Sequence, residues 1–166
     1  MTLIPHLKRQ FAYNAWANRE TLRSLVAALS DRPEAVPPRA VEVMAHLVGG
    51  EWAWVRRLGP ASPDMPVWPT LSLDQCDAQL RALSATWKQY LDALTPEELD
   101  RDLAYVKFKG EHWTSKVGDV LTHVFTHGCY HRGQVATLLG RAGFPVPYTD
   151  YIECVRRGYI AGGWPP

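Results

Sequence analysis

Hydrophobic residues recur three or four positions apart over long stretches of this chain, and prolines and glycines interrupt them. This spacing predicts a helix from Pro5 to about Leu29, where the sequence Ser-Asp-Arg-Pro breaks the pattern. It predicts a second helix from about Arg39 to Leu58, because Gly59-Pro60 then ends the periodicity. Two amphipathic helices therefore occupy the first third of the chain.

The next segment, Gly59 to Thr70, contains four prolines and is too averse to helical geometry to hide a further element. A third helix begins at Ser72, since Ser-Leu-Asp-Gln has the N-cap and N3 residues of a capping box, and its apolar spacing continues to Leu94. Thr95-Pro96 repeats the start signal and predicts a short helix to Asp100.

Residues Arg101 to Trp113 alternate in polarity around Lys109-Gly110, which indicates an extended hairpin that crosses the bundle. A fourth long helix is expected from Thr114 or Ser115 to about Leu139, before Gly140 and Gly143. An irregular stretch from Gly143 to Pro147 follows. Thr149-Asp150, with Glu153 three residues after the aspartate, then caps a short fifth helix.

Four long helices that each carry one apolar face bury those faces by packing as a bundle. The fold class is therefore all-α, a four-helix bundle with short additional helices and a small hairpin. The long connections after the second and third helices permit crossovers in place of simple up-and-down order. With no internal repeat, residues 1–166 are expected to form a single domain.

Composition narrows the function. The chain is 46% hydrophobic and 21% charged, as in ordinary soluble domains, and its formal net charge of +1 offers no basic surface for nucleic acid. The three cysteines, Cys76, Cys129 and Cys154, show no zinc-ribbon spacing, and their odd number suits a reducing compartment. Without a signal-like or bilayer-length apolar run, we expect a cytoplasmic protein that neither enters membranes nor binds nucleic acid.

Candidate chemistry lies in the run HVFTHGCYHRGQ, where His123, His127 and His131 are spaced four apart in the predicted fourth helix. On a helical wheel, His131 lies about 40° from the apolar centre, His127 about 80° and His123 about 120°. Imidazoles at i and i+4 share a helix face and can reach one ion. His46, within the second predicted helix, is the preferred third ligand, and a plain position at the core edge suits it equally well. The spacing favours metal binding for His127 and His131 and a plain surface position for His123.

The segments HGCYHRGQ, HLVGGE and YNAWANRE together resemble the DinB/YfiT family of damage-inducible four-helix-bundle metalloproteins, and the similarity covers nearly the whole chain. The resemblance implies a crossover bundle, a homodimer and a divalent ion held by His46, His127 and His131. His123 matches a histidine that neighbours such sites without joining them. Zinc or nickel suits three imidazoles best, and iron or manganese also fits.

The wider superfamily includes transferases of low-molecular-weight thiols, thiol-dependent isomerases and proposed metal hydrolases. The resemblance therefore favours thiol-dependent S-transfer with a small-molecule substrate and a thiol cofactor at the metal. A metal-dependent hydrolase and a non-enzymatic metal-binding stress protein remain the alternatives.

Supporting roles are open at several positions. Glu42 and Asp119 each lie one turn before a histidine and either orient its imidazole or remain solvated on a helix flank. Arg132 and Gln134 either bind a carboxylate or fix a neighbouring helix.

Other residues favour packing roles. The glycines Gly49, Gly50 and Gly133 indicate close helix approach, with space for a ligand as the alternative. Cys129 points away from the histidines and is expected to be inert. The aromatic residues in helical spacing are interpreted as core, namely Trp16, Trp52 and Trp54.

Overall fold

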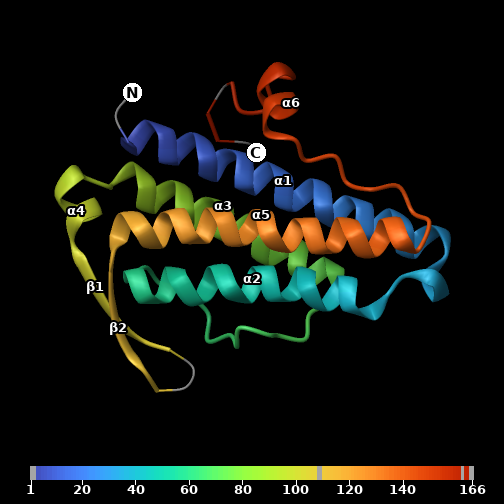
Figure 1. Ribbon diagram of the computed structural model, residues 1–166, viewed down its shortest axis with the longest axis horizontal. Helices are drawn as coiled ribbons and strands as arrows, with labels where there is room; N and C mark the ends of the chain where they lie inside the picture. The colour runs from blue at the N-terminus through green and yellow to red at the C-terminus, as the bar shows by residue number, and fades with distance from the viewer. Residues whose placement is uncertain (1–2, 108–109, 162, 165–166) are drawn as a thin grey trace.

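The structure, a computed structural model, describes residues 3–107, 110–161 and 163–164 and confirms the all-α class (Figure 1). The four long helices are α1 (Leu3–Asp31), α2 (Pro38–Leu58), α3 (Leu73–Asp92) and α5 (Val117–Arg141). Short elements connect or follow them: η1 (Pro33–Ala35), α4 (Pro96–Asp100), β1 (Asp102–Val106), β2 (His112–Lys116) and α6 (Tyr151–Arg156).

The long helices form a bundle in which α1 packs against α3 and α5, and α2 packs against the same two helices. Helices α1 and α5 run in one direction and α2 and α3 in the other (Figure 1). The crossover is made by residues 59–72, which pass back along α2 before α3 begins. Extended chain spans about 3.3 Å per residue, so this segment is long enough to return along a helix that rises 1.5 Å per residue.

The boundary residues act as the sequence predicts. Ser72 and Gln75 form a reciprocal capping box at the start of α3, and the Asp150 carboxylate accepts a hydrogen bond from the Glu153 amide at the start of α6. Gly59 ends α2 with a φ of 111°, a left-handed conformation that side chains disfavour. Local chemistry therefore sets the ends of these helices.

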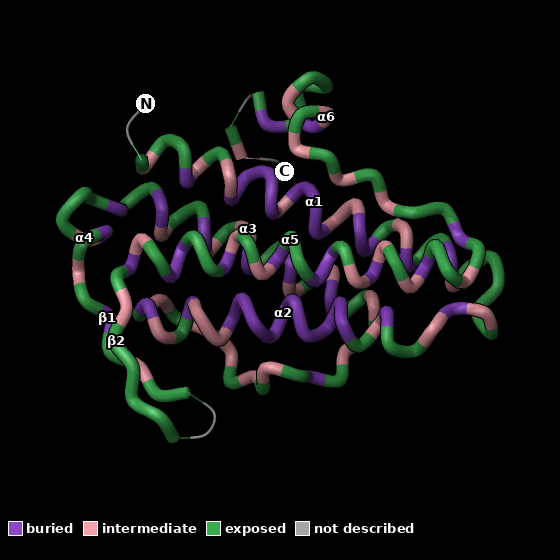
Figure 2. Tube along the Cα trace, in the orientation of Figure 1, coloured by how far each residue is buried: buried purple, intermediate pink, exposed green. Residues whose placement is uncertain are grey.

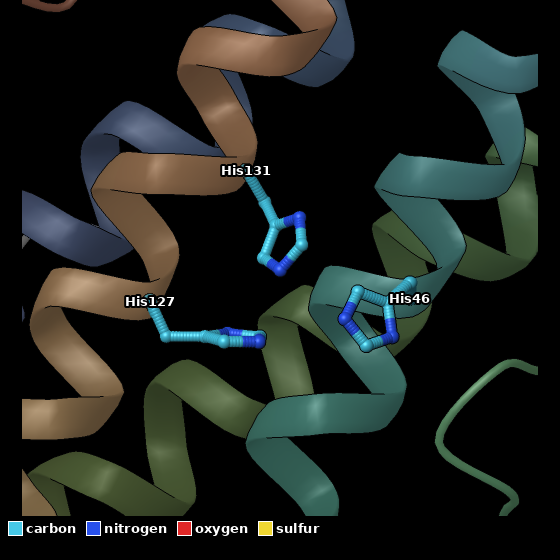
Figure 3. A group of neighbouring side chains, drawn as sticks. All are labelled: His46, His127 and His131. Carbon is cyan, nitrogen blue, oxygen red and sulfur yellow. The ribbon is translucent and has the colours of Figure 1, made fainter.

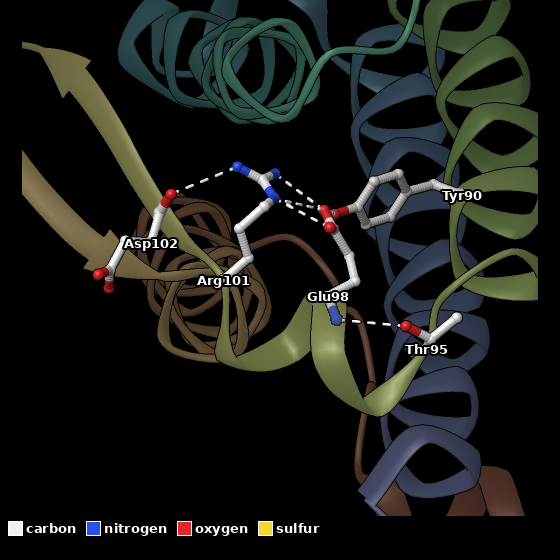
Figure 4. Close-up of polar contacts among 5 residues, drawn as sticks. All are labelled: Tyr90, Thr95, Glu98, Arg101 and Asp102. Atoms are coloured by element: carbon white, nitrogen blue, oxygen red, sulfur yellow. Dashed lines mark hydrogen bonds and ion pairs between the residues drawn. The ribbon is translucent and has the colours of Figure 1, made fainter.

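Helix α4 is held between α3 and the hairpin by one carboxylate (Figure 4). Thr95 Oγ1 accepts a hydrogen bond from the Glu98 amide at 3.2 Å, and the Glu98 carboxylate accepts bonds of 2.8–2.9 Å from the Arg101 guanidinium. The Tyr90 hydroxyl of α3 donates to the same carboxylate at 3.5 Å, and its pKa is raised to about 12, chiefly by burial. These contacts fix where the chain leaves the bundle to form β1.

Two expectations about the hairpin are wrong. The last long helix starts at Val117 and not at Thr114 or Ser115, because these two residues pair with β1 opposite Ala104 and Leu103. The hairpin also does not cross the bundle but projects from its end beside α2 (Figure 1). Of the expected Lys109-Gly110 turn, Lys109 lies outside the described residues, and Gly110 has a φ of 78°.

The core lies between the four long helices, whose inward faces are buried (Figure 2). Trp16 and Trp52 are buried as expected, whereas Trp54 is only half-buried and lines a pocket, so its assignment to the core is wrong. A smaller apolar cluster, including Tyr13 and Cys154, attaches α6 to α1. Within the described residues, no helix has the length and apolar character required to cross a bilayer.

Candidate metal centre

Three imidazoles from two helices meet inside the bundle (Figure 3). His46 comes from α2, and His127 and His131 come from successive turns of α5. One ring nitrogen from each lies within 4.8 Å of the other two, and the ring centroids are 4.3–5.3 Å apart. The structure therefore brings together the three residues that the sequence named, in a group that could hold a metal ion.

Hydrogen bonds orient two of these rings. His46 Nδ1 lies 2.8 Å from the Val67 carbonyl oxygen, and His131 Nδ1 lies 2.9 Å from Gln134 Oε1. Because these oxygens only accept, each Nδ1 carries the proton and each Nε2 keeps its lone pair for an ion. The sequence indicated Gln134 as a supporting residue but not as a hydrogen-bond acceptor for His131, and it gave no indication of the contact between Val67 and His46.

The proline-rich crossover also covers His46. The Trp68 indole stacks on the His46 ring at 3.7 Å and 11°, and the Arg39 guanidinium lies 4.5 Å from the centre of the same indole. The crossover can approach this closely because Gly49 has no side chain: a Cβ there would lie 2.6 Å from the Pro66 carbonyl oxygen. The prolines indicated a long loop near the site, but the sequence around His46 gave no indication that this loop packs on its ring.

Two further glycines test the expectation of close packing. A Cβ on Gly50 would lie 3.0 Å from His127 Cε1, so this glycine leaves room for the imidazole. A Cβ on Gly133 would meet none of the described atoms within 4 Å, and the expectation is wrong there. Gly133 is exposed on the outer surface of α5.

Burial keeps the imidazoles neutral. It lowers the pKa of His127 to about 3, with smaller contributions from His131, His46 and His123. Burial is also the largest cause of the lowered pKa of His46 and of His131. Neutral imidazole is the form that binds metal ions, so the donor set fits a divalent cation without first losing protons.

A pocket of about 790 Å³ opens beside the cluster, between α2, the start of α5 and the hairpin. His46 and His127 form part of its wall. Its remaining lining is mixed, with aromatic, charged and small residues that include Trp54, Arg57, Tyr105, Asp119 and His123. A small molecule that enters it would meet the histidine cluster.

The other residues proposed to support the site lie in different places. His123 lies in the pocket, with its ring 5.6 Å from His127, and is outside the three-histidine group. Asp119 lines the pocket, and among the described residues no hydrogen bond joins it to His123. Glu42 is exposed and pairs with Arg39 at 2.9 Å, so it is the solvated carboxylate of the two alternatives.

Behind the histidines lies a feature that sequence reasoning missed. Asn14 and Asn18 of α1 each donate to Glu51 Oε1 of α2 at 2.9 Å, and Trp87 Nε1 of α3 donates to Oε2 at 2.8 Å. Arg132 Nη1 of α5 donates to the Asn14 and Asn18 carbonyl oxygens at 2.6 and 2.7 Å. We call these five residues the buried network, which links all four long helices.

The charges of the buried network are almost fully enclosed, with Glu51 3% and Arg132 2% exposed. Burial raises the pKa of Glu51, while the three donated hydrogen bonds and Arg132 act in the opposite direction. Arg132 Nη2 also donates to Cys129 Sγ at 3.2 Å, which places this cysteine beside the guanidinium and outside the histidine cluster. The one sequence feature that could have indicated this network is the four-residue spacing of the two asparagines in YNAWAN, which is the same as that of the histidines.

The chain is thus a helical bundle with three neutral imidazoles, two of which line a pocket, in a group that could hold a divalent ion. The chain belongs to the DinB family, whose family model matches residues 4–157. It is similar to Protein DinB of Bacillus subtilis (strain 168), with 24% identity over 154 residues that cover 85% of this chain and 88% of the relative. No solved structure matches the chain.

Proposed function

We propose that the chain holds a divalent metal ion on His46, His127 and His131 and uses it for thiol-dependent S-transfer to a small electrophile. The observation that carries the proposal is the convergence of three ring nitrogens beside an open pocket. When bound, such an ion stabilises a thiol as its thiolate, the nucleophilic form. Zinc or nickel is the proposed ion, and iron or manganese would also accept this donor set.

The residues of the chain hold and orient the donors. Val67 and Gln134 keep the protons of His46 and His131 on Nδ1, which directs the lone pairs of Nε2 toward the centre of the cluster. Among the described residues, the group includes no fourth histidine, cysteine or carboxylate. A site with three protein ligands leaves a position for an exogenous group, as catalytic metal sites do.

The pocket supports a small thiol and a second small reactant in this proposal. The half-buried Trp54 and the Tyr105 ring pack edge to face at 5.1 Å and form one apolar wall. His123, Arg57 and Asp119 supply polar groups along the same cavity. This arrangement suits a small molecule.

Elemental analysis of the purified protein tests the ligand set. We expect about one divalent ion per chain in the wild type, and a large loss in His46→Ala and in His131→Ala, since two imidazoles rarely complete such a site. His6→Ala is the matched control, because His6 is an exposed histidine on α1, outside the cluster. Unchanged metal content in both cluster variants would refute the assignment.

Turnover then separates the possible reactions. S-transfer requires that a physiological thiol alter the spectrum of the cobalt-substituted protein and react faster with chlorodinitrobenzene, and that His127→Ala abolish both effects. Turnover of ester or amide substrates with water alone would replace the proposal with a metal hydrolase. A protein that loses its fold with its metal and shows neither activity would be a non-enzymatic metal-binding protein.

The proposal also includes a homodimer in the cytoplasm, acting in a stress response on small molecules. Sedimentation equilibrium tests the oligomeric state, and cell fractionation tests the location. A monomer at all measured concentrations would remove the dimer from the proposal and leave the metal site unaffected.

A further inference from the structure

We infer that the buried network of Asn14, Asn18, Glu51, Trp87 and Arg132 is a positioning device for the metal centre. The inference rests on the proposed metal binding and assigns to five residues without a direct contact to the ion the task of setting the distance between its ligands. It accounts for two charged residues that are buried behind the site, where apolar residues would pack more simply.

On α5 a network residue directly follows a ligand, and on α2 the network residue follows the glycine that accommodates a ligand ring. Arg132 directly follows the ligand His131 on α5. On α2, Glu51 directly follows Gly50, the residue that makes room for the His127 ring. Because successive helical residues point about 100° apart, the same turn presents one residue to the ion and the next to the network. A shift of either helix at the network therefore moves a ligand.

The approach of the helices leaves no slack at this level. A Cβ on Gly128, the residue after the ligand His127, would lie 2.5 Å from Asn14 Oδ1 and 2.8 Å from Arg132 Nη1. The Asn14 amide and the Arg132 guanidinium therefore fill the space beside Gly128, and a methyl group there would displace them. The network fixes α1 against α5 and also against α2, and so it sets how α2 and α5 face each other at the histidines.

The hydrogen bonds add a direction that apolar packing lacks. Each asparagine turns its amide nitrogen toward the Glu51 carboxylate and its carbonyl oxygen toward Arg132. A flipped amide would bring its oxygen against the carboxylate and its NH₂ against the guanidinium, so both charges enforce the same orientation. Hydrophobic burial is non-directional, whereas metal ligands require placement to about 0.5 Å.

The test compares the cobalt(II) affinity of metal-free variants of residues 1–166. Asn18→Leu removes both hydrogen bonds of one asparagine and keeps its number of side-chain heavy atoms. Trp87→Phe removes the bond to Glu51 Oε2 together with part of a buried ring. Leu7→Ala is the control, because Leu7 is a buried residue of the same helix, about two turns before Asn14. Urea denaturation measures how much stability each variant loses.

We expect folded Asn18→Leu to bind cobalt about tenfold more weakly, or worse, with an altered visible spectrum. Trp87→Phe should show a smaller loss in the same direction. Leu7→Ala should keep the affinity and spectrum of the wild type despite its lower stability, because its cavity lies away from the ligands. A purely structural role would lower stability in all three variants without changing the cobalt affinity, whereas a positioning role lowers the affinity only in the network variants.

Wild-type affinity and spectrum in folded Asn18→Leu would overturn the inference, as would an equal loss in Leu7→Ala. If Asn18→Leu does not fold, Trp87→Phe decides in the same way. If the wild type binds no divalent ion, the proposed function fails. The inference is then decided without metal, by nuclear Overhauser contacts between the His46 and His131 rings, whose centroids lie 4.5 Å apart. These contacts should persist in Leu7→Ala and disappear in Asn18→Leu, and their persistence in both would overturn it.

Discussion

Removing the buried guanidinium by Arg132→Met should destabilise the metal-free protein severely. The substitution keeps an unbranched side chain that matches Arg132 as far as Nε but deletes the donors to Asn14, Asn18 and Cys129. It leaves Glu51, which is 3% exposed, as a buried carboxylate without its cationic partner. The loss therefore combines unmade hydrogen bonds with an uncompensated charge.

The expected cost follows from that burial. Glu51 and Arg132 are bridged by Asn14 and Asn18, so removal of either charge leaves the other buried and uncompensated, which typically costs about 3–5 kcal/mol of unfolding free energy. For a chain of this length, each kcal/mol lowers Tm by about 2–4 °C, so the melting temperature should fall by roughly 6–20 °C. Arg81→Met is the matched control. Arg81 is exposed and pairs with Asp77 on the surface of α3, where such a pair contributes at most about 1 kcal/mol.

The destabilisation should also depend on pH in one direction. Burial raises the pKa of Glu51 above its ordinary value of 4.5, and loss of Arg132 removes an influence that lowers it. A carboxyl group with a raised pKa in the folded state contributes its full stability below the ordinary pKa and loses it as pH rises through the folded value. The variant should therefore lie closest to the wild type below about pH 4.5 and fall further behind as pH rises above it.

Urea denaturation followed by circular dichroism, repeated across this pH range, measures both effects. Glu51→Met/Arg132→Met should lose less stability than the sum of the two single variants, because it leaves neither charge alone. A single-variant loss below about 1 kcal/mol, or strictly additive losses, would show that the two charges are not energetically coupled.

Three further outcomes follow from the structure. Gly49→Ala should destabilise the protein and weaken metal binding, because a Cβ would meet the crossover that carries Val67. Exposed Gly133→Ala should instead stabilise α5 by up to about 1 kcal/mol. Thermal melts and cobalt titration compare the two variants. The pKa of His127 is about 3, so the unfolded chain takes up a proton at this residue before the folded chain does. Stability of the metal-free protein should then fall as pH drops from about 6.5, with a shallower slope in His127→Gln; identical slopes in acid titrations would contradict this. Ser72→Ala should cost about 1 kcal/mol through loss of the capping box, and an unchanged Tm would exclude a role for the cap.

Local sequence carries much of the fold because its signals act within one or two turns. The periodicity of α1 and α2 and the caps at Ser72 and Asp150 each involve residues fewer than five positions apart. The same reach places His127 and His131 on one face of a helix. The start of α5 was missed because Thr114 and Ser115 are held by pairing with β1, an interaction across the hairpin that competes with helix formation.

The sequence by itself thus determined the helices, their caps and the shared face of two imidazoles, and together with the family resemblance it singled out His46. Only the tertiary structure decided that the Val67 carbonyl orients His46, that Trp68 covers it, and that Glu51 and Arg132 are joined through two asparagines. A helical turn is specified by neighbours along the chain. The partner of a side chain across the bundle depends on how the helices rotate and cross over, which is settled only when all four pack at once.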